Sequence, residues 1–197
     1  MNIVSKGAVA LVGATGLAGG GIFISRNINW KTEANTIAKH IKSEYLLNTS
    51  HNQQWTHRVE LIKKSNDANL KSQLLTVEDL QNWCTNNLKE EFKGEQDSHF
   101  LNVKLYCGLN IGDKIEGSKV TSTLSKEDSK LKANVDKLAQ KKKEELGEEL
   151  SAIKDKNNTT PNWEGSEALK GWCLKTFDLA FEVGSNYENA KLYCVTN

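Results

Sequence analysis

The chain has 197 residues, of which 38% are hydrophobic and 26% are charged, so it is long enough for one core or two small ones. Its 26 basic and 25 acidic residues give a formal charge of +1. This net charge excludes an overall electrostatic attraction of the chain to nucleic acid or to an anionic membrane surface. The single proline, Pro161, and the few turn clusters favour a mainly α fold over a many-stranded β fold.

The N-terminal region contains an uncharged stretch that is long enough to cross a membrane. Residues 7–25 carry no charged side chain and lie between Lys6 and Arg26, and about twenty apolar residues span a bilayer as a helix. We therefore expect residues 1–26 to be a transmembrane anchor, with a cleaved signal peptide as the alternative. Gly20 stands where a bacterial lipobox needs its lipidated cysteine, so a thioether anchor is excluded.

The same stretch resembles the glycine turn of a short-chain dehydrogenase through Gly13, Gly16 and Gly19. In that fold the glycines let the backbone approach a pyrophosphate. Tyr187 and Lys191 have the Tyr-xxx-Lys spacing that such enzymes use for catalysis. The chain between these motifs lacks the buried Val, Ile and Leu runs of a parallel sheet. An NAD(P)-dependent reductase is therefore kept only as an alternative.

Two amphipathic helices are expected after the anchor. Residues 27–49 and residues 52–64 each place apolar side chains at the 3.6-residue period of a helix with one buried face. The first stripe consists of Trp30, Ala34, Ile37, Ala38, Ile41 and Tyr45, and the second of Trp55, Val59 and Ile62. The four histidines show no spacing of paired ligands, so we predict no metal site; they are His40, His51, His57 and His99.

Every cysteine belongs to a motif that occurs twice, in which a Trp-Cys dipeptide is followed by a Tyr-Cys dipeptide. The first halves of the two copies match at an offset of 89 residues and the second halves at an offset of 87. Because the difference falls in the loop between the halves, we predict two duplicated helix-loop-helix units. The copies are Trp83-Cys84 with Tyr106-Cys107, and Trp172-Cys173 with Tyr193-Cys194.

The first copy begins with a capping signal, because Thr76 is followed three residues later by Asp79. Apolar residues then recur at every fourth position from Leu80 to Phe92, which predicts a helix. Residues 100–107 are predicted to form a second short helix, although their alternation of apolar residues also allows a strand.

The cysteine spacing favours disulfides over a metal cage. Zinc ligands usually lie two to four residues apart, whereas the nearest two cysteines here are about twenty residues apart. The midpoint of each cysteine pair in the sequence falls next to a glycine of the predicted turn. The two cysteines of a pair should therefore lie opposite each other on the two helices of the predicted hairpin. We predict the disulfides Cys84–Cys107 and Cys173–Cys194, each contributing roughly 3 kcal/mol in the loop-entropy model. Four buried reduced thiols are the alternative.

Residues 113–158 are highly charged and contain no aromatic side chain. Their apolar stripe predicts one long helix that packs on one side only or pairs with a second chain. Lys141, Lys142 and Lys143 adjoin Glu144 and Glu145, so we interpret them as a solvated helix face and predict no nucleic-acid site. The stripe consists of Leu131, Val135, Leu138, Leu146, Leu150 and Ile153.

The predicted organisation is thus mainly α and has four parts. An N-terminal anchor or signal occupies residues 1–26, and a helical region with the first Trp-Cys/Tyr-Cys unit occupies residues 27–112. A charged helical insert comes next at residues 113–160, and the second unit occupies residues 161–197.

The whole pattern resembles the large paralogous families of N-terminally anchored proteins in haemotropic mycoplasmas. The shared features are a short Gly/Ala-rich span, a Tyr45-Leu46-Leu47 segment, and Trp-Cys and Tyr-Cys units in a Lys- and Asn-rich chain. The resemblance covers nearly the full chain and consists of spacings, without a catalytic signature. It implies a wall-less bacterium and an anchored protein outside the cell, one member of a divergent array.

We therefore expect a non-enzymatic membrane-anchored surface protein, antigenically variable or in contact with a host. The sequence has no nucleophile with a base, no ligand cluster and no phosphate loop, so we predict no catalytic residue and no cofactor. The expected partners are the membrane, through residues 7–25, and a host or self protein. The positive-inside rule leaves the orientation nearly undecided, so an inward-facing membrane scaffold is a further alternative.

Overall fold

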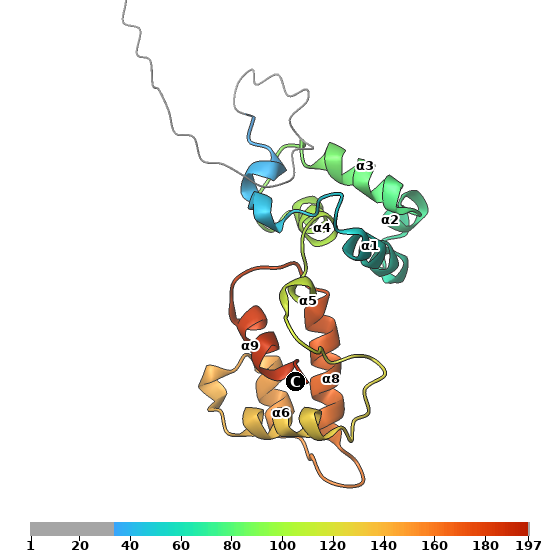
Figure 1. Ribbon diagram of the computed structural model, residues 1–197. Coiled ribbons are helices and arrows are strands. Elements are labelled where there is room, and N and C mark those ends of the chain that lie inside the picture. Colours follow the sequence, from blue (N-terminus) through green and yellow to red (C-terminus); the bar gives the residue numbers. More distant parts are fainter. Residues whose placement is uncertain (1–33, 197) are drawn as a thin grey trace, which may run out of the picture.

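The computed structural model describes residues 34–196 and is shown in Figure 1. Within this range the regular structure consists of nine α-helices and three short 3-10 helices, with only isolated β-bridges, so the prediction of a mainly α chain is confirmed. No helix of residues 34–196 is long and apolar enough to cross a membrane. The predicted anchor at residues 7–25 and the Gly13-Gly16-Gly19 pattern lie outside the described residues.

The helices form two consecutive groups, and each group encloses its own hydrophobic core (Figure 1). We call them the first repeat (residues 35–109) and the second repeat (residues 109–196). The first consists of η1 (Ile37–His40), η2 (Ser43–Tyr45), α1 (Asn52–Lys64), α2 (Ala68–Gln73), α3 (Val77–Asn87) and α4 (Ser98–Cys107). The second consists of α5 (Ile111–Lys114), α6 (Ser129–Ala139), η3 (Lys143–Glu145), α7 (Glu148–Lys154), α8 (Glu164–Phe177) and α9 (Ser185–Tyr193).

Each repeat ends in the helical hairpin that the duplicated motif predicts. Helix α3 packs against α4, and α8 packs against α9. The hydroxyl of Thr76 accepts a hydrogen bond from the N–H of Asp79 at 3.1 Å, and the Asp79 carboxylate accepts from the N–H of Thr76 at 3.0 Å. This capping box fixes the start of α3. Residues 100–107 are helical, so the alternative of a strand there is wrong.

The duplication extends beyond the hairpins to the first long helix of each repeat. Helices α1 and α6 bury the same four positions at a constant offset of 76 residues. Helix α2 contacts α1 as α7 contacts α6. The four buried positions are Trp55, Arg58, Val59 and Ile62 in α1, and Leu131, Asn134, Val135 and Leu138 in α6. The described chain is therefore a tandem duplication of one helical unit.

The backbone hydrogen bonds at the start of each repeat are equivalent. The N–H of Ile37 donates to the carbonyl of Glu90, and the N–H of Ile111 donates to the carbonyl of Leu179, both at 2.9 Å. Because 90 and 179 differ by the same 89 residues as the Trp-Cys dipeptides, the short helices η1 and α5 occupy matching places in their repeats.

The ends of the repeats are equivalent as well. The N–H of Leu109 donates to the carbonyl of Tyr45 at 2.7 Å, and the N–H of Thr196 donates to the carbonyl of Ser118 at 2.7 Å. The carbonyl of Leu109 also accepts from the N–H of Phe181 at 2.8 Å, a bond that belongs to the start of the second repeat. Leu109 is thus the last residue of one repeat and the first residue of the next.

The charged segment at residues 113–160 is not a separate insert, contrary to the prediction. Its apolar stripe is buried in the same core as α8 and α9. It lacks aromatic residues, yet its helices α6 and α7 take the places that α1 and α2 occupy in the first repeat. The absence of aromatic side chains was therefore a misleading criterion, because leucine and valine fill the equivalent core positions.

The prediction of one long helix in this segment is also wrong, although its stripe is buried. Helix α6 ends at Ala139 and α7 begins at Glu148. A continuous helix would carry Lys142 into the apolar stripe, and burying an unpaired ammonium is costly. The Lys154 ammonium donates instead to the carbonyls of Ala139 and Lys141, which satisfies the exposed C-terminal end of α6.

The predicted helix over residues 27–49 is wrong for the part that the structure describes. Residues 34–49 form extended chain and the two short helices η1 and η2. Several of their backbone groups bond to the hairpin and not along a continuous helix, as when the N–H of Phe92 donates to the carbonyl of Asn35 at 2.8 Å. Ile37 and Ile41 are still buried, so the apolar stripe correctly indicated which residues are buried but not that they form a helix. By contrast, α1 has the bounds predicted for the second helix.

A substitution at Gly112 tests the close packing of α5 on α8. A Cβ atom on Gly112 would lie 2.9 Å from the Cβ of Phe177 and 3.1 Å from its carbonyl oxygen. We expect Gly112→Ala to lower the free energy of unfolding by about 1–3 kcal/mol, measured by urea denaturation. The matched control is Gly171→Ala in the exposed face of α8, where nothing lies within 4 Å; it should raise the free energy of unfolding by up to about 1 kcal/mol. Equal effects of the two substitutions would contradict this packing.

Candidate functional site at the joint between the repeats

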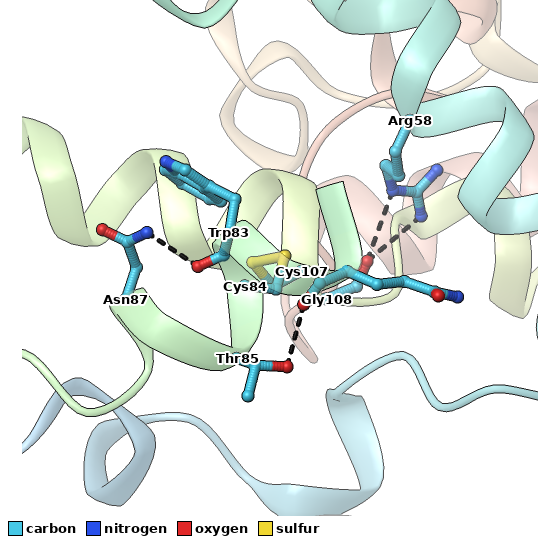
Figure 2. The surroundings of a disulfide bond; sticks show 8 residues. Arg58, Trp83, Cys84, Thr85, Asn87, Cys107 and Gly108 are labelled. Carbon is cyan, nitrogen blue, oxygen red and sulfur yellow. Dashed lines mark hydrogen bonds between the residues drawn. A yellow bond between two sulfur atoms is a disulfide. The ribbon is translucent and has the colours of Figure 1, made fainter. Parts of the chain in front are cut away.

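The four predicted site residues are brought together as two disulfides with the expected pairing. Cys84 bonds to Cys107 with their Cα atoms 5.6 Å apart, and Cys173 bonds to Cys194 with their Cα atoms 5.5 Å apart. All four are buried. Each bridge crosses its hairpin from the first helix to the second, as Figure 2 shows for the first repeat. The alternative of four reduced thiols is not what the structure contains.

The tryptophans beside the bridges do not pack against each other. Trp83 packs on the first core, which also contains Trp55, and Trp172 is buried in the second core. The ring of Trp83 lies edge-on to His99, with centroids 6.1 Å apart.

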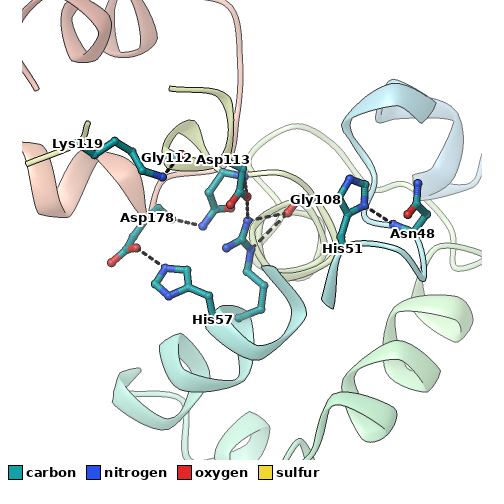
Figure 3. Close-up of polar contacts among 10 residues, drawn as sticks. Asn48, His51, His57, Gly108, Gly112, Asp113, Lys119 and Asp178 are labelled. Atoms are coloured by element: carbon teal, nitrogen blue, oxygen red, sulfur yellow. Dashed lines mark hydrogen bonds and ion pairs between the residues drawn. The ribbon is translucent and has the colours of Figure 1, made fainter. Parts of the chain in front are cut away.

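The joint between the repeats is organised around the fully buried Arg58 of α1. Its Nε and Nη2 atoms donate to the carbonyl of Gly108 at 3.3 Å and 3.2 Å (Figure 2). Nη2 also forms an ion pair with the carboxylate of Asp113, which belongs to α5 of the second repeat (Figure 3). Burial lowers the pKa of Arg58, and the Asp113 carboxylate opposes that shift. Arg58 thus links the end of one repeat to the first helix of the next.

Polar and aromatic contacts surround this buried pair. The ring of His57 bonds to the Asp178 carboxylate at 2.8 Å (Figure 3), and the side-chain amide of Asn110 donates to the Asp178 carbonyl at 2.8 Å. The ring of Tyr45 in the first repeat also meets that of Phe181 in the second repeat edge-on, with centroids 4.8 Å apart. The joint therefore has a charged centre and both polar and aromatic contacts.

A pocket of about 320 Å³ opens at the joint, and we call it the joint pocket. Both repeats line it, with Lys42, Tyr45 and Lys104 from the first and Phe181 and Glu182 from the second. Lys104 forms an ion pair with Glu182 across the pocket, so part of its polar lining is already engaged. The lining contains no cysteine, serine or threonine.

Of the residues that suggested a dehydrogenase, the structure describes Tyr187 and Lys191. Tyr187 and Lys191 are neighbours on one face of α9, with the Lys191 ammonium 4.7 Å from the centre of the Tyr187 ring and 2.7 Å from Glu188. Neither lines the joint pocket, and Gly13, Gly16 and Gly19 lie outside the described residues. Residues 34–196 also hold no cluster of three or more His, Cys, Asp or Glu side chains that could bind a metal ion.

Comparison with protein-family models, curated proteins and solved structures finds no match to this chain.

Arg58 and Asp113, the centre of the joint, are not among the residues predicted from the sequence. The only signal in the sequence was that Arg58 lies between Trp55 and Val59, inside the apolar stripe of α1, where a solvated arginine is not expected. A charged residue on a buried helix face indicates a buried partner, but Asp113 is 55 residues away and its position depends on the fold.

Removing the charge of Asp113 tests the buried ion pair. Asp113→Asn keeps the shape of the side chain and an acceptor for the N–H of Asn110, which donates to the carboxylate at 2.8 Å. It leaves the buried guanidinium without a counter-charge, so we expect the free energy of unfolding to fall by about 3–5 kcal/mol. The double substitution Arg58→Met with Asp113→Asn should recover part of this loss in the same urea titration. If Asp113→Asn left the free energy of unfolding unchanged, the ion pair would contribute nothing to stability.

Proposed function

We propose that this chain is a non-enzymatic surface protein, anchored by residues 7–25 and carrying its two repeats outside the cell. The observation that supports this proposal is the presence of one buried disulfide at the equivalent place in each repeat, with no free cysteine among residues 34–196. Disulfides persist in oxidising compartments and are rare where cellular reductants keep thiols reduced. Repeats that face outward lie in such an oxidising compartment, where both disulfides persist.

The proposed role is contact with a host or with a self protein, by a surface that can vary. The comparison of the two repeats supports such variability, since they keep the same buried positions while the offset between them changes from 76 residues at α1 and α6 to 89 at α3 and α8. These changes fall in the connecting loops. Equivalent exposed positions also differ in chemistry, as Leu101 in α4 and Glu188 in α9 do. Surface residues and loop lengths can therefore change without altering the core.

Limited proteolysis of intact cells tests the outward orientation. Lys156 is exposed in the loop between α7 and α8, and each disulfide lies wholly on one side of it. Trypsin added to intact cells that produce the full chain should therefore divide it into two fragments even without reductant. The matched control is a cytoplasmic protein of the same cells, which should stay intact.

Thiol trapping in the same cells provides an independent measurement. Alkylation under denaturing conditions should label no cysteine of the chain before reduction and all four after it, as mass spectrometry reads out. The opposite outcome would contradict the proposal and favour the inward-facing scaffold: trypsin cleaves the chain only after the cells are permeabilised, and the cysteines are alkylated before reduction.

A further inference from the structure

Two connections of the second repeat are longer than their counterparts in the first repeat. Leu46 and Lys119 are equivalent, because each forms a β-bridge with the residue after the second cysteine of its hairpin. Five residues (47–51) separate Leu46 from α1, whereas nine residues (120–128) separate Lys119 from α6. Three residues (74–76) connect α2 to α3, whereas nine residues (155–163) connect α7 to α8. We call residues 120–128 and 155–163 the distal loops; the first repeat encloses its core without this additional length.

The distal loops belong to the end of the molecule that lies away from the start of the first repeat. In Figure 1 the described chain begins at the top, beside η1, and the connection between α7 and α8 forms the opposite tip. The predicted anchor at residues 7–25 precedes the first repeat in the chain. An anchored chain therefore carries the distal loops on the repeat that does not adjoin the anchor.

Hydrogen bonds hold the distal loops to each other and to the helices. The ammonium of Lys126 donates to the carbonyl of Asn162 at 3.2 Å and so links the two loops. The side-chain oxygen of Asn158 accepts from the N–H and the hydroxyl of Ser166 in α8, at 3.0 Å and 2.7 Å. A surface that is ordered before binding loses less conformational entropy when a partner binds.

The exposed side chains of the distal loops are short and mostly neutral, with threonine, serine and asparagine predominating. The charged residues of the loops are two lysines and three acids: Lys126, Lys156, Glu127, Asp128 and Asp155. The large exposed hydrophobic residues of the described chain lie elsewhere, at Leu75, Leu101, Leu179, Val183 and Leu192. The loops therefore present a polar surface with neither a basic patch nor an apolar patch.

This chemistry selects the kind of partner. Nucleic acids and anionic membranes bind clusters of lysine and arginine, and permanent oligomers use apolar interfaces. Antibody–antigen interfaces are instead polar and hydrated, and antibodies contact their antigens largely through tyrosine, serine and asparagine. We propose that the distal loops are the surface of this chain to which antibodies of a host bind. This inference rests on the proposed outward orientation, because antibodies reach only the outside of an intact cell.

Adsorption of a serum on variant chains provides the test. The serum is raised by immunisation with the purified full chain, with both disulfides intact. The distal variant combines Ser122→Glu with Thr160→Glu, since a carboxylate that antibody binding buries without a counter-charge opposes that binding. The matched control combines Thr49→Glu with Leu75→Glu in the corresponding short connections of the first repeat. All four residues are exposed, so both variants should keep the circular dichroism spectrum and the disulfides of the unchanged chain.

Serum adsorbed on the control variant should lose almost all of its binding to the unchanged chain, whereas serum adsorbed on the distal variant should keep the larger part. The proposal is overturned if the distal variant removes the larger part of the binding, or if the control variant leaves the larger part. It is also overturned if the purified chain self-associates in sedimentation velocity and the distal variant does not, because a second copy then occupies the loops. The measurement uses the purified chain, so its failure leaves the outward orientation untouched.

Discussion

One buried side-chain donor closes each repeat, and the rest of the arrangement depends on it. In the first repeat Arg58 reaches the carbonyl of Gly108, and in the second the amide of Asn134 donates to the carbonyl of Val195 at 2.8 Å. Both donors come from the same position of the first long helix and bind the residue directly after the second cysteine of the hairpin. The disulfide fixes the hairpin to itself, and this donor fixes the end of the hairpin to the remainder of its core.

The two donors differ because the carbonyls that they bind have different neighbours. After Gly108 the chain continues into α5, which presents Asp113, so a guanidinium finds both a carbonyl and a counter-charge. The Val195 carbonyl has no such acid beside its donor among the described residues, and a neutral amide avoids burying a charge without a partner. Because Leu109 is shared, no flexible linker separates the repeats, and the orientation of one on the other is set by backbone pairing as well as by side chains.

The hairpins and disulfides could be predicted because their signals are local or symmetric. The capping box at Thr76, the stripe from Leu80 and the level spacing of the cysteines all depend on short stretches of chain. The duplication of the preceding helices could not be predicted in the same way, since few identical residues remain and the offset changes at each loop. Val59 and Val135 match, but Trp55 corresponds to Leu131 and Arg58 to Asn134. The helix predicted for residues 34–49 does not form because several of their backbone hydrogen-bond partners are distant in the sequence.

The charges on the outer ends of the pair have a consequence for polymerisation. If the first repeat of another copy docked on the second repeat by the same joint, the Lys104–Glu182 ion pair would be replaced by Lys191 facing Lys93. At the place of the His57–Asp178 contact, the equivalent residues Ala133 and Lys89 would face each other. Head-to-tail contacts that do not close generate filaments, and like charges at the contact oppose them. The charges at the joint thus match within the pair of repeats and oppose the same joint between two copies of the chain.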